Sequence, residues 1–222
     1  MNRVILIFCC LLFVLNTYGQ TCGNPGARIE RLKAAQLSKD SIYNLVKTDL
    51  DFIKPIPNDT IADIGSYDGY YPLVYSIFSD SVVFYLNDIS SDGFSYFDSI
   101  EDICTKIKRH NLSNKFTVVI GNDSSTSLRD HMFNKVVIRD ALHHFKSMDI
   151  MLSDIKRIMK SNAKLILFEP IRGRNINEET LCKGTMTVDE LMKLLNKNGF
   201  VLAREFPQTI GGSWFEFKQT DD

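Results

Sequence analysis

Segments typical of strands and of helices alternate along most of this 222-residue chain. Five short runs are rich in β-branched and aromatic residues, as buried strands are, and they lie at or near Ile61, Ser81, Phe116, Phe133 and Lys164. Between them, apolar residues recur at helical spacing. Parallel strands need crossover helices of this kind, so the alternation predicts an α/β fold, a doubly wound and mostly parallel sheet with helices on both faces.

The C-terminal part of the chain predicts one more helix and two more strands. Thr187 and Glu190 have the spacing of a capping box, which predicts a helix over Val188–Lys197. Phe200–Glu205 and Trp214–Lys218 have strand character, and the short connection between them carries two glycines. We therefore expect these strands to form an antiparallel hairpin that completes a seven-stranded sheet.

The N-terminus has the pattern of a cleaved signal peptide. A short positive head ends at Arg3, an apolar run follows over Val4–Leu15, and small residues precede Gln20. A run of this length is too short to span a bilayer comfortably. We expect residues 1–19 to be removed, residues 20–27 to be a disordered lead-in, and residues 28–222 to form one domain of a periplasmic or secreted protein.

Composition says little about partners. The formal net charge is −1, and the sequence has no long run of like charge. Neither a nucleic acid nor an anionic membrane is favoured as a partner, and no stable membrane span is expected after signal cleavage. The predicted partner is a small-molecule substrate, and the oligomeric state stays open.

Three cysteines would remain in the mature chain: Cys22, Cys104 and Cys182. An odd number without paired spacing predicts neither a disulfide framework nor a metal site. At most one disulfide can form among them. Cys22 also lacks the preceding Leu and small residue that lipoprotein signals carry, so we do not expect it to be lipidated.

The first predicted strand runs into a glycine-containing turn, IADIGSYDGYY, over Ile61–Tyr71. Asp63, Gly65 and Gly69 have the spacing D-x-G-x-x-x-G, in which glycine lets backbone N–H groups approach a ligand. The turn predicts a nucleotide-like cofactor, and a plain strand-to-helix turn is the alternative. The spacing G-x-G-x-x-G of nicotinamide-dependent oxidoreductases is absent, which argues against that class.

Acidic residues follow the next two strands. Asp88 ends the second strand roughly 20 residues after the glycine turn, where doubly wound folds place a carboxylate on the ribose hydroxyls. A helix N-cap or an Asx turn is the alternative role of Asp88. Asp123 follows the third strand, where it could reach an adenine edge or simply end the strand.

Polar residues follow the fourth strand, over 139–145. Ligands of open α/β sheets bind at the carboxyl ends of the strands, so these residues should face the cofactor crevice. His143 and His144 are the candidate catalytic bases, with His143 the first choice, because an imidazole accepts a proton near neutral pH. The alternative is that one of the two packs or caps the next helix. Tyr70 and Tyr71 could shape the cavity or belong to the core.

The ordered set of motifs resembles the class I S-adenosylmethionine-dependent methyltransferases, in particular those that act on small molecules and quinones. IADIGSYDGYY resembles the first motif of that family, YLNDIS its acidic second-strand motif, VVIGNDSS the end of its third strand, and FNKVVIRDALHHF its fourth strand. The resemblance runs from Ile61 to Lys218. It implies a Rossmann-like methyltransferase fold with S-adenosylmethionine as cofactor and no metal.

The resemblance also implies a role for each matching residue. The positions expected to bind the cofactor are Asp63, Gly65, Ser66 and Gly69 around the methionine end, Asp88 on the ribose, Asp123 beside the adenine and Asp140 near the sulfonium. Where the family often has a further glycine, this chain has Tyr67, whose backbone lacks the freedom of glycine.

The predicted function is methyl transfer from S-adenosylmethionine to an unidentified acceptor, expected to be a small molecule. The alternative is an exported protein with a methyltransferase fold that binds a ligand or partner without catalysis. The predicted signal peptide motivates this alternative, because the cofactor is made in the cytosol.

Overall fold

A computed structural model of the protein describes residues 38–174, 181–207 and 212–220. The predicted signal peptide and the lead-in lie outside these ranges and stay predictions. The apolar spacing over residues 28–46 predicts an amphipathic helix, or two short ones broken near Ser38, and the part before residue 38 also lies outside the described ranges. Among the described residues, no helix combines the length and the apolar character that crossing a bilayer requires.

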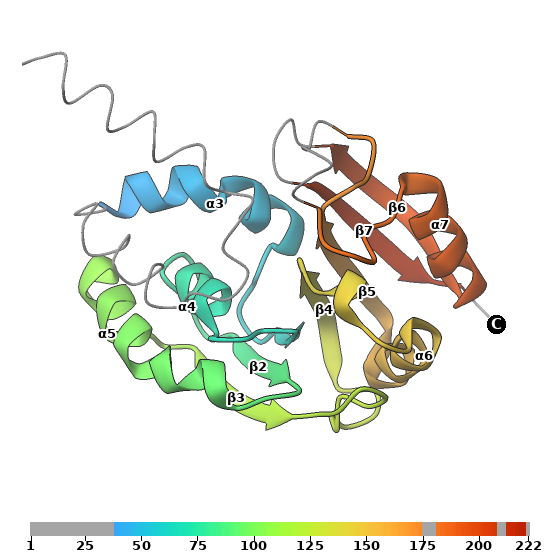
Figure 1. Ribbon diagram of the computed structural model, residues 1–222. Coiled ribbons are helices and arrows are strands. Elements are labelled where there is room, and N and C mark those ends of the chain that lie inside the picture. The colour runs from blue at the N-terminus through green and yellow to red at the C-terminus, as the bar shows by residue number, and fades with distance from the viewer. Residues whose placement is uncertain (1–37, 175–180, 208–211, 221–222) are drawn as a thin grey trace, which may run out of the picture.

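All strands in the described ranges belong to one seven-stranded sheet (Figure 1). They are β1 (Thr60–Ile64), β2 (Val83–Asp88), β3 (Lys115–Ile120), β4 (Phe133–Arg139), β5 (Met159–Glu169), β6 (Phe200–Pro207) and β7 (Ser213–Gln219). Their order in the sheet is β3-β2-β1-β4-β5-β7-β6. The first five strands are parallel, and β7 runs antiparallel to both β5 and β6. The predicted fold class is therefore confirmed.

Helices cover both faces of the sheet. They are α3 (Lys39–Ile53), α4 (Tyr70–Ser76), α5 (Phe97–Lys108), α6 (Met148–Ile158) and α7 (Val188–Lys197), with 3-10 turns η1 (Asp92–Tyr96) and η2 (Leu142–His144). Side chains of a strand alternate between its faces. Val136 and Ile138 of β4 accordingly join the core beneath α6 and α7, and Val137 joins the core beneath α3, α4 and α5.

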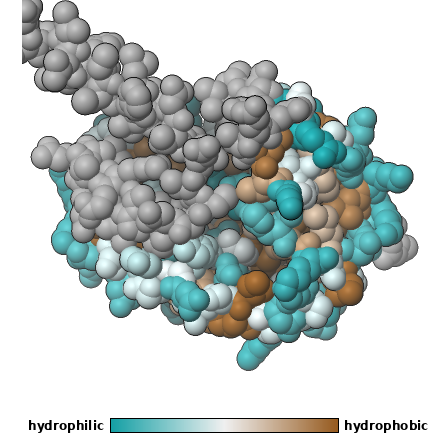
Figure 2. Space-filling model, viewed as in Figure 1, coloured by the Kyte–Doolittle hydropathy of each residue, from teal (hydrophilic) through white to brown (hydrophobic). Residues whose placement is uncertain are grey.

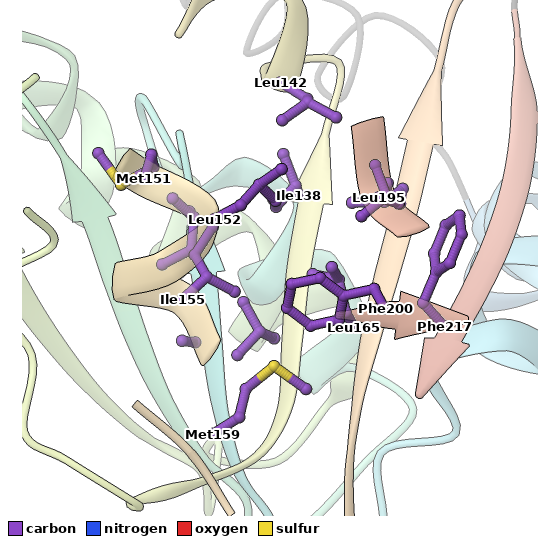
Figure 3. Packing of buried hydrophobic residues seen from close by; sticks show 14 of the residues in the cluster. Ile138, Leu142, Met151, Leu152, Ile155, Met159, Leu165, Leu195, Phe200 and Phe217 are labelled. Atoms are coloured by element: carbon purple, nitrogen blue, oxygen red, sulfur yellow. The ribbon is translucent and has the colours of Figure 1, made fainter. Parts of the chain in front are cut away.

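The core on the α6 and α7 face is formed by branched aliphatic and aromatic side chains. Figure 3 shows Leu152 and Ile155 of α6 and Leu195 of α7 pointing toward Ile138 and Leu165 of the sheet. Each of these side chains is fully buried, and burial of one such side chain contributes about 1.5–3 kcal/mol. On the outside, the described surface mixes hydrophilic residues with smaller hydrophobic areas (Figure 2).

The helix α3 ends later than predicted. Its break was predicted near Ser38, and Ser38 is in fact the N-cap, since its side chain accepts a hydrogen bond from the backbone N–H of Ser41. The periodicity predicted an end at Val46, but α3 continues to Ile53. The last part of the helix lacks an apolar pattern in the sequence, because Asp49 occupies a buried position that an apolar residue usually fills.

One predicted turn is wrong. The polar sequence of Lys160–Ala163 predicts a turn between helix and strand, yet these residues belong to β5. Met159 pairs with Phe133, and the register shifts before Lys135 pairs with Lys164. Residues 160–162 are exposed and polar in this irregular stretch, so their composition resembles that of a turn. The predicted capping box of Thr187 and Glu190 at the start of α7 is confirmed.

Candidate functional site

The glycine turn between β1 and α4 lies tightly against the end of β4. Gly65 has φ +76° and Gly69 has φ +70°, values that glycine adopts without strain. A Cβ atom on Gly65 would lie 2.5 Å from the Cβ of Ala141. Glycine at position 65 therefore allows the turn to approach the segment that follows β4.

Backbone amides of this turn bind the end of β2. The N–H groups of Gly65 and Ser66 donate to the carbonyl of Asn87, at 2.9 and 3.0 Å. The N–H of Tyr67 donates to Oδ2 of Asp88 at 2.8 Å. The sequence suggested amides that approach a ligand directly, but these three already have protein partners. Their effect is to hold the acidic end of β2 beside the turn.

Asp88 combines the two roles that the sequence left open. Besides the bond from Tyr67, its Oδ1 accepts hydrogen bonds from the N–H groups of Ile89 at 2.8 Å and Ser90 at 3.3 Å. These are the local bonds of an Asx turn. The side chain nevertheless points to the glycine turn and is only partly buried, and each carboxylate oxygen accepts more than one hydrogen bond. A ligand at this edge of the sheet can therefore still reach Asp88.

Tyr67 takes a conformation that usually requires glycine. Its φ is +54°, in the left-handed region that is uncommon for bulky residues. An ideal Cβ on Gly93 would lie 2.4 Å from the carbonyl oxygen of Tyr67 and 2.9 Å from its Cδ2. The tyrosine thus packs against η1, close after the end of β2, and the turn keeps its shape without a glycine at this position.

Asp63 is buried at the end of β1. Burial raises the pKa of its carboxyl from 3.8 to about 6, although the positive charge of Arg139 opposes the shift. The hydroxyl of Ser66 lies near this carboxyl but makes no hydrogen bond of standard geometry within the described ranges. A buried carboxylate and a buried, unsatisfied hydroxyl thus lie together at the turn.

Arg139 was not singled out from the sequence, although it ends the buried strand β4. Its Nη1 lies 2.8 Å from Oδ2 of Asp49 on α3, and both side chains are almost fully buried. The guanidinium also lies over three aromatic rings, those of Tyr71, Phe168 and Trp214. These contacts fasten α3 to the sheet, and Figure 1 shows α3 on the same side as the C-terminal ends of β4 and β5. An arginine ending a buried strand was the only sequence signal.

His143 is held by Glu169, the last residue of β5. Its Nδ1 lies 2.7 Å from Oε2 of Glu169, and Oε1 accepts hydrogen bonds from the N–H groups of Ala141 and Leu142. Burial alone would lower the pKa of His143, but the hydrogen bond and charge of Glu169 outweigh it and raise the pKa to about 9. This imidazole is therefore protonated near neutral pH and is a poor base there.

His144 has the opposite properties. Its ring centroid lies 4.0 Å from that of His143, and the residue is exposed. Partial burial of the ring and the neighbouring charge of His143 lower the pKa of His144. A neutral, accessible imidazole suits general-base catalysis, so the geometry favours His144 over His143, the first choice from the sequence.

The two remaining predicted residues lie at the ends of β3 and β4. Asp123 is exposed, and its Oδ2 lies 2.6 Å from Nζ of Lys146. Asp140 is exposed with φ +54°, and its N–H donates to the carbonyl of Phe168 at 2.6 Å. Both lie after parallel strands, at the edge of the sheet that carries Asp63 and Asp88.

Known structures resemble the whole arrangement. An S-adenosylmethionine-dependent methyltransferase from Aquifex aeolicus matches with a TM-score of 0.60 at 15% identity, over 82% of this chain and 97% of the other. An arsenic(III) S-adenosylmethionine methyltransferase from Chlamydomonas reinhardtii matches with a TM-score of 0.56 at 14% identity, over 73% and 63%. The [4+2]-cyclase SpnF matches with a TM-score of 0.57 at 14% identity, over 73% and 58%.

The chain has the class I methyltransferase fold. In sequence, the family model of a methyltransferase domain matches residues 93–167, from η1 to β5, and no curated protein matches. The methyltransferase fold expected from the motifs is thus confirmed, and the match of residues 93–167 to a methyltransferase-domain model indicates S-adenosylmethionine as the cofactor. The matched range does not include the glycine turn or Asp88. The assignment of these residues to a cofactor site therefore depends mainly on the geometry described above.

Proposed function

We propose that this protein transfers a methyl group from S-adenosylmethionine to a small-molecule acceptor. The observation that carries the proposal is the convergence of the glycine turn and Asp88, joined by the 2.8 Å hydrogen bond from Tyr67 N–H to Oδ2 of Asp88. A carboxylate held beside a glycine turn at the carboxyl edge of a parallel sheet is the arrangement that binds the ribose of a nucleoside.

The chemistry of the residues fits such a cofactor. Asp88 is partly exposed and keeps acceptor capacity for ribose hydroxyls. Asp63 and the unsatisfied hydroxyl of Ser66 supply an acceptor and a hydroxyl for the polar methionine end. Asp123 and Asp140 lie at the ends of neighbouring strands, where we place the adenine and the sulfonium. Gly65 lets the turn approach this edge, since any side chain there would meet Ala141.

S-adenosylmethionine supplies an electrophilic methyl group, so the protein has to align the acceptor and remove its proton where the nucleophile is weak. His144 is the residue proposed for proton removal, because it is exposed and its pKa is lowered. His143 then has a positioning role: Glu169 fixes its ring, and its charge keeps His144 neutral.

The first experiment measures binding of S-adenosylhomocysteine and S-adenosylmethionine to the purified mature chain by calorimetry. Asp88→Asn should weaken binding about tenfold or more, because a hydrogen bond to a charged acceptor contributes about 1.5–3 kcal/mol. Asp98→Asn, an exposed carboxylate in the first turn of α5, is the matched control and should leave binding unchanged. Absence of binding at millimolar cofactor would refute methyl transfer and leave the non-catalytic alternative.

The second experiment addresses the base. With an acceptor found by screening for release of S-adenosylhomocysteine, His144→Gln should lower kcat about 100-fold, the usual contribution of one general base, with little effect on cofactor affinity. An unchanged kcat would exclude His144 from proton removal. His110→Gln, an exposed histidine after α5, controls for loss of a surface imidazole.

Export is part of the proposal. The positive head and apolar run of residues 1–19 support it. A reporter that is active only outside the cytoplasm, fused after residue 25, should become active. Retention of the fusion in the cytoplasm would refute export and would place the protein in the compartment where its cofactor is made.

A further inference from the structure

Two histidines and a cysteine gather beyond the end of β4. His143 and His144 belong to η2, and Cys182 comes from the segment between β5 and α7. One ligand atom from each residue, a ring nitrogen or the thiol sulfur, lies within 4.8 Å of the other two. Imidazole nitrogen and thiolate sulfur are the ligands that zinc prefers in proteins.

The buried histidine of this group has an unsatisfied atom. His143 is 4% exposed, and its Nε2 makes no hydrogen bond of standard geometry with any residue that the structure describes, although the side chain of Cys182 lies close enough to interact with the ring. A buried polar group without a partner destabilises a fold by about 1–3 kcal/mol. Because Nδ1 is engaged by Glu169 at 2.7 Å, Nε2 is the nitrogen left to bind a ligand.

Glu169 gives this histidine the carboxylate partner that metal-bound histidines commonly have on the nitrogen away from the metal. Metal-bound histidines commonly donate their other N–H to a carboxylate, which fixes the tautomer and the ring orientation. The carboxylate of Glu169 is itself fixed by the N–H groups of Ala141 and Leu142, at 3.0 and 2.8 Å. The ring of His143 is therefore oriented before any ion arrives.

The backbone around Cys182 brings its sulfur to this histidine pair. Gly184 has φ +93°, and a Cβ there would lie 2.4 Å from the carbonyl oxygen of His143, so only glycine lets this segment lie on η2. The hydroxyl and N–H of Thr185 donate to the carbonyl of Cys182, at 2.7 and 3.3 Å. These bonds hold the turn from which Cys182 reaches the histidines.

We propose that His143, His144 and Cys182 bind a zinc ion. Zinc bonds of about 2.0–2.3 Å put ligand atoms within about 3.8 Å of one another, so the group must contract by roughly 1 Å. His144 is exposed and Cys182 only partly buried, and small side-chain rotations of these two suffice. Three protein ligands leave the fourth position open to water or another ligand, unlike the closed set of structural zinc sites.

The site is separate from the residues proposed for the cofactor, although it is close to them and shares His144 with the proposed base. A zinc-bound His144 cannot remove a proton, so the proposed base acts only in the zinc-free chain. Ala141, two residues before His143, contacts the glycine turn at Gly65. Zinc binding does not depend on methyl transfer, because its ligands and their support are complete without the cofactor. A chain that binds zinc but not S-adenosylmethionine would support this inference and refute the proposed function.

The test uses the mature chain, reduced and freed of metal by a chelator. Titration with Co²⁺ should produce a thiolate-to-cobalt charge-transfer band that saturates at one equivalent, and Zn²⁺ should displace it. Competition with a chromophoric chelator then gives the zinc affinity. Absence of the band, or of saturable zinc binding, would overturn the inference.

Variants locate the ion. Cys182→Ser should abolish the charge-transfer band. Glu169→Gln, which removes the charge that orients His143, should weaken zinc binding about 10–100-fold, and His144→Ala should weaken it at least as much. Cys104→Ala and His110→Ala remove the same residue types elsewhere and should bind zinc as the wild type does. Circular dichroism confirms that each variant is folded. A charge-transfer band that persists in folded Cys182→Ser would place the metal at another cysteine and refute the site.

Discussion

Removal of the charge at Asp63 should stabilise the protein at neutral pH. The residue is 6% exposed at the end of β1, and burial raises its pKa from 3.8 to about 6. A shift of about two pKa units corresponds to about 3 kcal/mol, at 1.36 kcal/mol per unit. Because the folded-state pKa is the higher one, the folded protein binds the proton more tightly, and ionisation destabilises the fold.

The pH window follows from these two values. The penalty is absent below the unfolded-state pKa of 3.8, grows as pH rises, and is complete above about 6. Asp63→Asn should therefore raise the free energy of unfolding by about 3 kcal/mol near pH 7 and by almost nothing near pH 4. The pH dependence caused by other ionisable groups is largely the same in wild type and Asp63→Asn, so it cancels in the difference between their free energies of unfolding.

Urea denaturation of Asp63→Asn and wild type across this range measures the effect. Asp98→Asn, which removes one exposed charge, is the control for a general charge effect. Equal differences at both ends of the pH range, or a less stable variant at pH 7, would refute the reasoning. If the charge at Asp63 serves the cofactor, the stabilised variant should also bind S-adenosylhomocysteine more weakly, as expected when a functional site is retained at the expense of stability.

Urea denaturation also tests the remaining predictions. Gly65→Ala should destabilise the protein by about 2–4 kcal/mol through strain at positive φ and the clash with Ala141; a double-mutant cycle with Ala141→Gly should recover the steric part, and no recovery would exclude the clash. Burial also raises the pKa of Asp49, but Arg139 pairs with this carboxylate in the core, so Asp49→Asn should lower stability by about 3–5 kcal/mol by leaving the buried charge of Arg139 without its partner; a loss under 1 kcal/mol, or a more stable variant, would show that desolvation of Asp49 cancels the attraction. Thr187→Ala should remove the N-cap of α7 at about 1 kcal/mol, whereas Thr187→Ser should keep the capping bond, and equal losses in both would contradict a capping role.

Local patterns were sufficient to predict most elements and the class of the sheet. The capping box of Thr187 and Glu190 and the alternation of strands and helices depend on residues close together in sequence. Parallel strands also leave few topologies once crossover helices are present. The same rule placed Asp63, Asp88 and the residues after β4 at one edge of the sheet.

Long-range contacts decided the rest. Met159 is in a strand because Phe133 pairs with it, and no local pattern reports that pairing. From the sequence, Asp49 is expected to be an exposed polar residue of a helix. It is buried because Arg139, ninety positions later, pairs with it in the core.

The site shows the same division. The sequence supplied His143 as a candidate base, but the fold set its charge by placing Glu169 against Nδ1 and the side chain of Cys182 near the ring. Residue type fixes which protons and ligands a side chain can exchange. Burial and partners, which arise only when distant segments pack together, fix which of those exchanges takes place.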